Sequence, residues 1–194
     1  FDPDTNSLDA FNVGYAGPQS VTTYHILEDF MALDLDLIAI ASPTQYHSEH
    51  LRTCLAAGVG RAWIEKPVTL DFAEFEDLLH AVDAMQTAPR ICVNYFRRAL
   101  PQVAQLKAHL RTGADVTGVE IIYSRKLAVN GVHMLDLLGH LFDVNTPPPL
   151  DWLRKDAGGA NPNFGLTIAG VPVTVTGHDL PYHLIELSVT GIHG

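Results

Sequence analysis

Short apolar runs alternate with amphipathic stretches in the first half of the chain. The run at 35–41 is apolar apart from one aspartate, a pattern typical of a buried strand in a parallel sheet. Further strands are predicted at 61–64 and 91–95, and helices are predicted between them over about 47–57 and from 72 onward. Because short links join strand to helix to strand, the pattern indicates a parallel sheet with right-handed crossovers.

Capping signals mark the boundaries of the two helices. Asp71 precedes the second helix and Glu74 follows three residues later, which is the spacing of a capping box. Apolar residues then recur every three or four positions, at Phe72, Phe75, Leu78, Leu79, Val82 and Met85. Gly58 supplies the expected stop for the first helix.

The pattern changes between residues 96 and 100. Pro101 is expected to begin a helix that ends near Gly113, and a strand is predicted over 116–124. Asn130 is expected to cap a helix that runs to about 142. Four later strands are predicted at 150–154, 164–169, 171–176 and 184–190. Short turns between them favour hairpins in an antiparallel or mixed sheet.

The fold class that follows is α/β. We expect a Rossmann-like parallel sheet over 1–96, followed by an α+β domain with a mostly antiparallel open sheet over 97–194. The chain opens with Phe1-Asp2-Pro3, which resembles the end of a strand, and it closes inside an alternating strand. We therefore expect the first domain to be truncated at its N-terminal side and the second at its C-terminal side.

Composition and charge exclude several classes of protein. The chain has 194 residues, 47% of them apolar, which is enough for a sizeable core. Its formal net charge of −10 makes nucleic acid a poor partner, and no apolar run approaches the roughly 20 residues that span a bilayer. The two cysteines, Cys54 and Cys92, form no disulfide framework, so a reducing, cytoplasmic setting is expected.

Polar residues follow each of the first three predicted strands. They are Ser42-Pro43-Thr44 with His47, then Glu65-Lys66-Pro67, then Asn94-Tyr95-Phe96-Arg97-Arg98. Ligands bind at the carboxyl ends of strands in open parallel sheets, so these residues are candidates for a site. The simpler alternatives stay open: a helix cap at 42–44, an ordinary first-turn histidine at 47, and a solvated charge pair at 65–66.

Lys66 is the first candidate for chemistry. A partly buried lysine can have a lowered pKa and act as a general acid or base, and a cis Pro67 would fix its direction. The arginines at 97 and 98 are compatible with a carboxylated or phosphorylated substrate or with a basic surface pair.

A second candidate lies on the predicted helix after Asn130. His133, Asp136 and His140 share one helical face, which could hold a proton-transfer group or a metal ion. The metal reading would make the protein a metal-dependent hydrolase, and we expect no metal. The alternative is a solvated face, just as His178 and His183 are most simply explained by a turn.

The motifs resemble those of the glucose–fructose oxidoreductase / inositol dehydrogenase (Gfo/Idh/MocA) family. The residues that carry the resemblance are Ala41-Ser42-Pro43-Thr44-Gln45-Tyr46-His47, Ala56-Ala57-Gly58 and Glu65-Lys66-Pro67. Later landmarks follow in the right order at Asn94–Arg98 and Asn130–Asp136. The resemblance covers essentially the whole chain, and the Glu-Lys-Pro element is its most specific part.

The resemblance implies an NAD(P)-dependent oxidoreductase that transfers a hydride between a sugar or polyol hydroxyl and a nicotinamide cofactor. Lys66 would hydrogen-bond the reacting hydroxyl and His133 would be its base. The implied cofactor-binding residues are Asp2, Ser42, Pro43, Thr44, His47, Glu65, Lys66 and Pro67. The implied substrate-binding residues are Asn94, Arg97, Asn130, His133 and Asp136. Asp2 would bind the adenosine ribose, which favours NAD over NADP, and the second domain's sheet would form a homo-oligomer.

The sequence departs from the family pattern at several positions. No G-x-G-x-x-G turn is present, so we expect the 194 residues to bind NAD weakly and to be largely inactive as an enzyme on their own. Val129 stands where many relatives have an aspartate four residues before the histidine, and Lys126 stands where some have glycine. These changes keep a second hypothesis open, a non-catalytic relative that binds a sugar or nucleotide and acts as a regulator.

Overall fold

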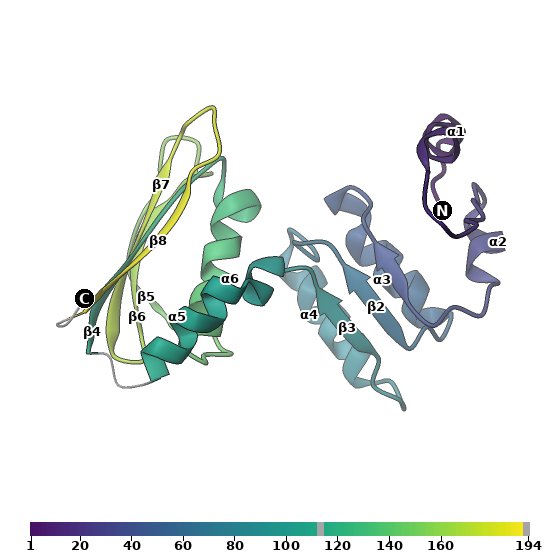
Figure 1. Cartoon of the computed structure of the whole chain (residues 1–194). Helices are drawn as coiled ribbons and strands as arrows, with labels where there is room; N and C mark the ends of the chain where they lie inside the picture. The colour runs from purple at the N-terminus through teal and green to yellow at the C-terminus, as the bar shows by residue number, and fades with distance from the viewer. Residues whose placement is uncertain (112–114, 192–194) are drawn as a thin grey trace. The chain divides into compact units, whose positions relative to one another are not determined.

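The computed structural model describes residues 1–111 and 115–191, which form two units (Figure 1). The first unit spans Phe1–Val93 and the second Asn94–Gly194. The division falls between residues 93 and 94, whereas the sequence placed it between 96 and 97. Each unit has its own sheet and its own hydrophobic core, so the two are described separately.

The first unit contains a parallel sheet of three strands in the order β1-β2-β3. The strands are β1 (Ile38–Ile40), β2 (Arg61–Ile64) and β3 (Arg90–Val93), and the crossovers are α3 (His47–Ala56) and α4 (Phe72–Asp83). Two helices precede them, α1 (Thr5–Gly14) and α2 (Leu27–Met31), and a short 3-10 turn lies at Thr44–Tyr46. The predicted alternation of strand and helix is confirmed, but Phe1 and Asp2 lie in a loop rather than at a strand end.

Local signals set the helix boundaries as the sequence predicts. The Asp71 side chain accepts a hydrogen bond of 2.9 Å from the Glu74 amide at the start of α4. Gly58 has a φ of +78° just after α3, a conformation that favours glycine. These local contacts explain why both boundaries could be read from the sequence.

One face of this sheet is buried and the other is exposed. Ile40 and Ile64 are buried against α3 and α4, whereas Ala39 and Trp63 between them face outward. The sequence pattern suggested strands buried on both faces. Burial alternates because the crossover helices contribute their apolar residues, such as Leu51 and Leu78, to one core.

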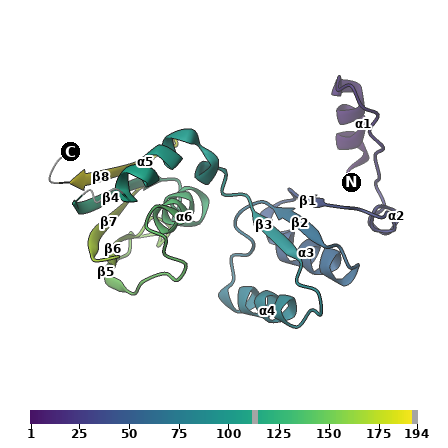
Figure 2. The same cartoon turned by 60° about the horizontal axis from the view of Figure 1, so that its bottom comes forward.

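The second unit is a mixed sheet of five strands covered by helices (Figures 1 and 2). Its order is β5-β6-β7-β4-β8, with β4 parallel to β7 and every other pair antiparallel. The strands are β4 (Val116–Ser124), β5 (Leu150–Arg154), β6 (Asn163–Ile168), β7 (Val171–His178) and β8 (Ile185–Gly191). The helices are α5 (Pro101–Arg111) and α6 (Val132–Leu141), with short turns at Phe96–Ala99 and Leu127–Gly131. The predicted mostly antiparallel sheet is confirmed, and the predicted helix end near Gly113 lies outside the described residues.

The core of the second unit lies between the sheet and α6. Ile121, Tyr123 and Val175 on the central strands have no exposed surface, and Met134 and Leu138 of α6 belong to the same cluster. This is the buried helix face that the sequence predicts. No helix within the described ranges has both the length and the apolar character needed to cross a membrane.

The prediction that Asn130 caps α6 is wrong. Residues Leu127–Gly131 already form a helical turn of the π type, and α6 continues from it. The Asn130 amide instead donates 2.8 Å to the carbonyl oxygen of Ser124, at the end of β4. Because Ser124 belongs to the preceding strand, the Asn130 side chain connects the helix to the sheet. Within the described residues, it does not accept a hydrogen bond from a backbone amide of the first turn of α6.

A group of ion pairs connects α5 to the residues after α6. Asp143 accepts from Lys107 Nζ at 2.5 Å and from Arg111 Nη2 at 2.7 Å. These hydrogen bonds lower the pKa of Asp143 to about 2 from its ordinary 3.8. Asp143 also has a φ of +55°, which asparagine tolerates better than most residues.

Asp143→Asn should therefore remove a pH-dependent part of the stability while keeping the backbone. A carboxyl group with a lowered pKa stabilises the fold above its unfolded pKa and loses that effect as the pH falls toward the folded value. We expect urea unfolding to show a less stable variant near about pH 5 and a vanishing difference near about pH 2. Asp151→Asn, at a carboxylate that accepts from Thr167, is the control. A constant difference across this range would contradict the prediction.

Candidate functional site

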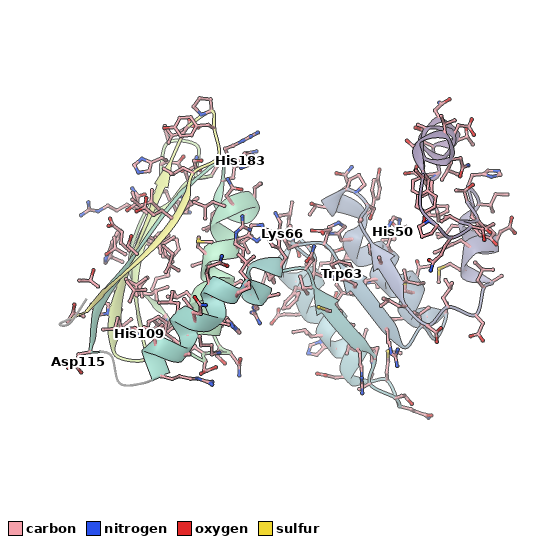
Figure 3. The ribbon with its side chains drawn as sticks, in the orientation of Figure 1. His50, Trp63, Lys66, His109, Asp115 and His183 are labelled. Carbon is pink, nitrogen blue, oxygen red and sulfur yellow. The ribbon has the colours of Figure 1, made fainter. Side chains whose placement is uncertain are left out.

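The turn that carries Lys66 lies at the carboxyl end of β2 (Figure 3). The Glu65 amide donates 2.9 Å to the carbonyl oxygen of Ile40, so the turn is tied to the end of β1. Lys66 is half-buried and its peptide bond to Pro67 is cis, as the sequence suggested. A half-buried lysine at this edge of a parallel sheet has the position expected for a ligand-binding group.

His47 connects the same turn to the end of β1. Its Nδ1 lies 2.7 Å from the carbonyl oxygen of Pro67, and its Nε2 lies 2.7 Å from that of Ser42. The side chain is only 1% exposed. Because both ring nitrogens face backbone oxygens, His47 positions the two loops, and this geometry favours a positioning role over the contact with the cofactor that the resemblance implies.

A second connection supports the turn from α4. The hydroxyls of Ser48 and Thr69 donate to the two oxygens of the Glu74 carboxylate. These hydrogen bonds, that from Ser48 first, lower the pKa of Glu74. Since Ser48 follows His47 in α3, two consecutive residues of one helix hold the segment 67–69 in place.

A cavity of about 720 Å³ lies beside β1 in the first unit. Three of the predicted cofactor residues line it: Asp2, Ser42 and Pro43. Thr44, His47 and the turn at 65–67 are not part of its lining. The cavity therefore gathers the predicted ribose-binding acid and the first strand-end motif, but not the second.

Sequence reasoning missed two residues of this cavity, Tyr46 and His50. Their rings stack with centroids 5.9 Å apart, and His50 Nδ1 lies 2.9 Å from the Ser42 hydroxyl. The signal was present in the helical spacing, because His50, Thr53 and Cys54 fall on one face of α3 and all line the cavity.

The cavity fits part of a dinucleotide. Asp2 supplies a carboxylate that can accept from ribose hydroxyls, Ser42 supplies a hydroxyl, and Tyr46 supplies an aromatic surface. The sequence contains no glycine-rich turn to hold the phosphates. The residues present thus suit the nucleoside portion of NAD.

His133 is buried near the start of α6, with 7% of its surface exposed. The rings of Tyr95 and Phe96 meet it edge-on, each with its centroid 6.0 Å away. A solvated position, the simpler alternative for this histidine, is therefore wrong. An imidazole among aromatic rings has few ways to move, which suits a group that must present one nitrogen to a ligand.

The other polar residues of α6 do not form a metal site. Asp136 makes a bidentate ion pair with Arg98, through Nε at 2.7 Å and through Nη2. Among the residues that the structure describes, no three His, Cys, Asp or Glu side chains gather to hold a metal ion. The stripe of His133, Asp136 and His140 is thus a buried histidine, an ion-paired carboxylate and a histidine whose pKa is lowered by burial and by Lys107.

The remaining predicted substrate residues also lie in the second unit. Asn94 is half-buried directly after β3, and Asn130 is buried in the turn before α6. The Arg97 guanidinium lies over the Phe96 ring at 4.7 Å, and burial lowers its pKa. Arg98 is paired with Asp136, whereas Nη1 of Arg97 is a buried nitrogen without a hydrogen-bond partner among the described residues.

The fold and the strand-end residues define a class: a Rossmann-type nucleotide-binding unit followed by an α+β unit. The sequence model of an oxidoreductase family with an NAD-binding Rossmann fold, Gfo/Idh/MocA, matches residues 1–94. Residues 1–94 of this chain thus belong to the Gfo/Idh/MocA oxidoreductase family, as the motifs suggested. No curated protein matches the chain.

Solved structures share the fold over nearly the whole chain. Myo-inositol 2-dehydrogenase from Lactobacillus plantarum has a TM-score of 0.76 at 18% identity, with 100% of this chain and 65% of that one covered. Apo scyllo-inositol dehydrogenase from Lactobacillus casei has a TM-score of 0.77 at 15% identity, with 100% and 64% covered. A dehydrogenase (MviM) from Clostridium difficile gives 0.77 at 16%, with 97% and 63% covered. The chain thus spans less than two thirds of the length of these structures.

Proposed function

We propose that the protein is an NAD-dependent dehydrogenase that acts on a cyclic polyol or sugar. The observation that carries the proposal is the Glu65-Lys66-Pro67 turn at the carboxyl end of β2, inside a domain of the Gfo/Idh/MocA family. Solved structures of the same fold include a myo-inositol and a scyllo-inositol dehydrogenase, which supports polyols as the substrate class.

The proposed roles are those that the resemblance to the family implies, and they agree with the chemistry of alcohol oxidation. NAD, when bound, supplies the hydride acceptor. Lys66 hydrogen-bonds the reacting hydroxyl, and His133 accepts the proton that the hydroxyl must lose as it becomes a carbonyl. Asp2, Ser42 and Pro43 hold the nucleoside portion of the cofactor. The Asp2 carboxylate would repel a 2′-phosphate, which favours NAD over NADP.

Nicotinamide reduction with a panel of polyols tests the proposal. The chain is mixed with millimolar NAD and with myo-inositol, scyllo-inositol or glucose in turn, because weak cofactor binding is expected without a glycine-rich turn. We expect reduced nicotinamide to form slowly with at least one cyclic polyol, because the 194 residues on their own are expected to be largely inactive, and more slowly still with NADP than with NAD. No reduction with any member of a broad polyol panel would contradict the proposal.

The second candidate is a non-catalytic regulator of the same family. Val129, in place of the aspartate that many relatives have near the histidine, favours this alternative. A regulator would bind a polyol or nucleotide tightly without reducing NAD, and Lys66→Ala would leave that binding unchanged. The same panel, read by calorimetry as well as by nicotinamide fluorescence, separates the two functions.

We also propose a homo-oligomer that forms through the sheet of the second unit, in a reducing, cytoplasmic setting. Along β4 and β7, Glu120 and Thr174 are exposed while Val119 and Val173 are buried, so the sheet has one open, polar face. Cys54 and Cys92 are both free thiols, which supports the reducing setting. Sedimentation at several protein concentrations tests the assembly, and a monomer at all of them would contradict it.

A further inference from the structure

Two consecutive residues after β4 have a backbone conformation that is unusual for side chains with a Cβ atom. Arg125 has a φ of +59° and Lys126 a φ of +74°. This left-handed region is favourable for glycine and unfavourable for arginine and lysine. Such positions are concentrated at functional sites, where the side chain is needed in spite of the backbone.

The surrounding chain holds this conformation in place. The side-chain oxygen of Asn161, a residue only 5% exposed, accepts from the Lys126 amide at 2.8 Å. The next amide, that of Leu127, donates 2.9 Å to the carbonyl oxygen of Ala160. Glycine at 126 could make both hydrogen bonds without the steric penalty, so the backbone alone does not explain a lysine.

Arg125 has a defined partner in His183, which is labelled in Figure 3. Its Nη1 lies 2.9 Å from His183 Nε2, and His183 Nδ1 lies 3.2 Å from the side-chain oxygen of Asn130. Arginine only donates, so Nε2 accepts this hydrogen bond. The side-chain amide of Asn130 lies against Nδ1, with its nitrogen 2.9 Å away, so the imidazole connects the guanidinium to the turn before α6.

These side chains line a cavity of about 710 Å³ at the end of the second unit's sheet. Arg125, Lys126 and His183 face it together with two carboxylates, Asp156 and Asp179. One Asp156 oxygen accepts from the Asn161 amide at 3.1 Å, so this residue also supports the loop. The cavity therefore offers two cationic side chains for an oxyanion and two carboxylates that can accept from hydroxyl groups.

We propose that this cavity binds an oxyanion carried by a hydroxylated ligand, which is the phosphate or carboxylate of an acidic sugar or polyol. The mixture of cations and carboxylates favours such a ligand over bare phosphate, because only hydroxyl groups can donate to Asp156 and Asp179. The proposal rests on the proposed function in one respect: it names the substrate of that polyol dehydrogenase as an acidic one.

Lys126→Gly is the decisive variant, because it removes the side chain and relieves the backbone at the same time. Calorimetry without NAD compares glucose 6-phosphate, glucuronate, neutral glucose and inorganic phosphate. We expect the acidic sugars to bind most tightly, and Lys126→Gly to bind them about tenfold or more weakly. Its thermal midpoint should be equal to or above that of the wild type.

Two control variants complete the test. Ala169→Gly relieves another positive φ, of +49°, without removing a charge, and should bind as the wild type does. Lys126→Arg keeps the charge and should retain most of the binding. Equal binding of glucose and glucose 6-phosphate by the wild type, or full binding by Lys126→Gly, would overturn the proposal. Because NAD is absent, either outcome is independent of whether the protein reduces nicotinamide.

Discussion

Lys66→Ala should lower the rate of nicotinamide reduction by about 10²–10⁴-fold, the range expected for loss of a positioned group that assists proton transfer. Lys66 lies half-buried in a turn that His47, Ser48 and Glu74 hold in place. The alanine variant keeps the backbone of the turn, so NAD affinity, measured by nicotinamide fluorescence, should change little. The expected effect is therefore on kcat rather than on cofactor binding.

A matched pair of variants shows whether the lysine acts through a directed hydrogen bond or through charge alone. Lys66→Arg keeps a positive charge, but its planar guanidinium cannot place a donor where the lysine ammonium does, so it should be nearly as inactive as the alanine variant. Lys155→Ala, in the loop after β5, removes a lysine from the second unit and should leave the rate unchanged. A wild-type rate in Lys66→Arg would show that the residue acts through its charge. An unchanged rate in Lys66→Ala would show that Lys66 takes no part in the reaction.

His47→Leu should destabilise the first unit by about 1–3 kcal/mol. Leucine is close in size, but it cannot donate to the carbonyl oxygens of Ser42 and Pro67 that face the two ring nitrogens, and the loss of one donor to a buried group costs about 1–3 kcal/mol. Urea unfolding measures the change. The nicotinamide-reducing activity should also fall, because the Lys66 turn loses its connection to β1.

His47→Gln distinguishes the loss of hydrogen bonds from a general loss of packing. The glutamine amide can donate to one of the two oxygens, so its effect should lie between those of wild type and leucine. His80→Leu, on the exposed face of α4, controls for the removal of a histidine. Equal stability of His47→Leu and wild type would show that the two loops are held by other contacts.

The sequence predicted those features that depend on neighbours in the chain. The Asp71 cap, the stop at Gly58 and the strand ends at Ser42 and Lys66 are set by residues within a few positions of each other. The parallel sheet could also be predicted, because a helix that connects two strands of one sheet over a short distance makes a right-handed crossover between parallel strands.

Contacts between distant residues could not be predicted. Arg98 and Asp136 are far apart in sequence, so their ion pair could not be predicted from the local pattern. Asn130 was expected to cap a helix because asparagine before an apolar helical stretch is a common cap. Its side-chain amide instead contacts the Ser124 carbonyl oxygen and the His183 ring. For the same reason the sequence did not show that His47 is buried between two carbonyl oxygens.

The placement of Trp63 and Trp152, the only two tryptophans in the sequence, gives the protein a built-in pair of optical probes. Trp63 lies on β2 of the first unit, three positions before Lys66, and is 45% exposed (Figure 3). Trp152 lies on β5 of the second unit and is 42% exposed. Replacing either tryptophan with phenylalanine leaves tryptophan fluorescence in one unit alone. Ligand binding and unfolding can then be followed in each half of the chain separately.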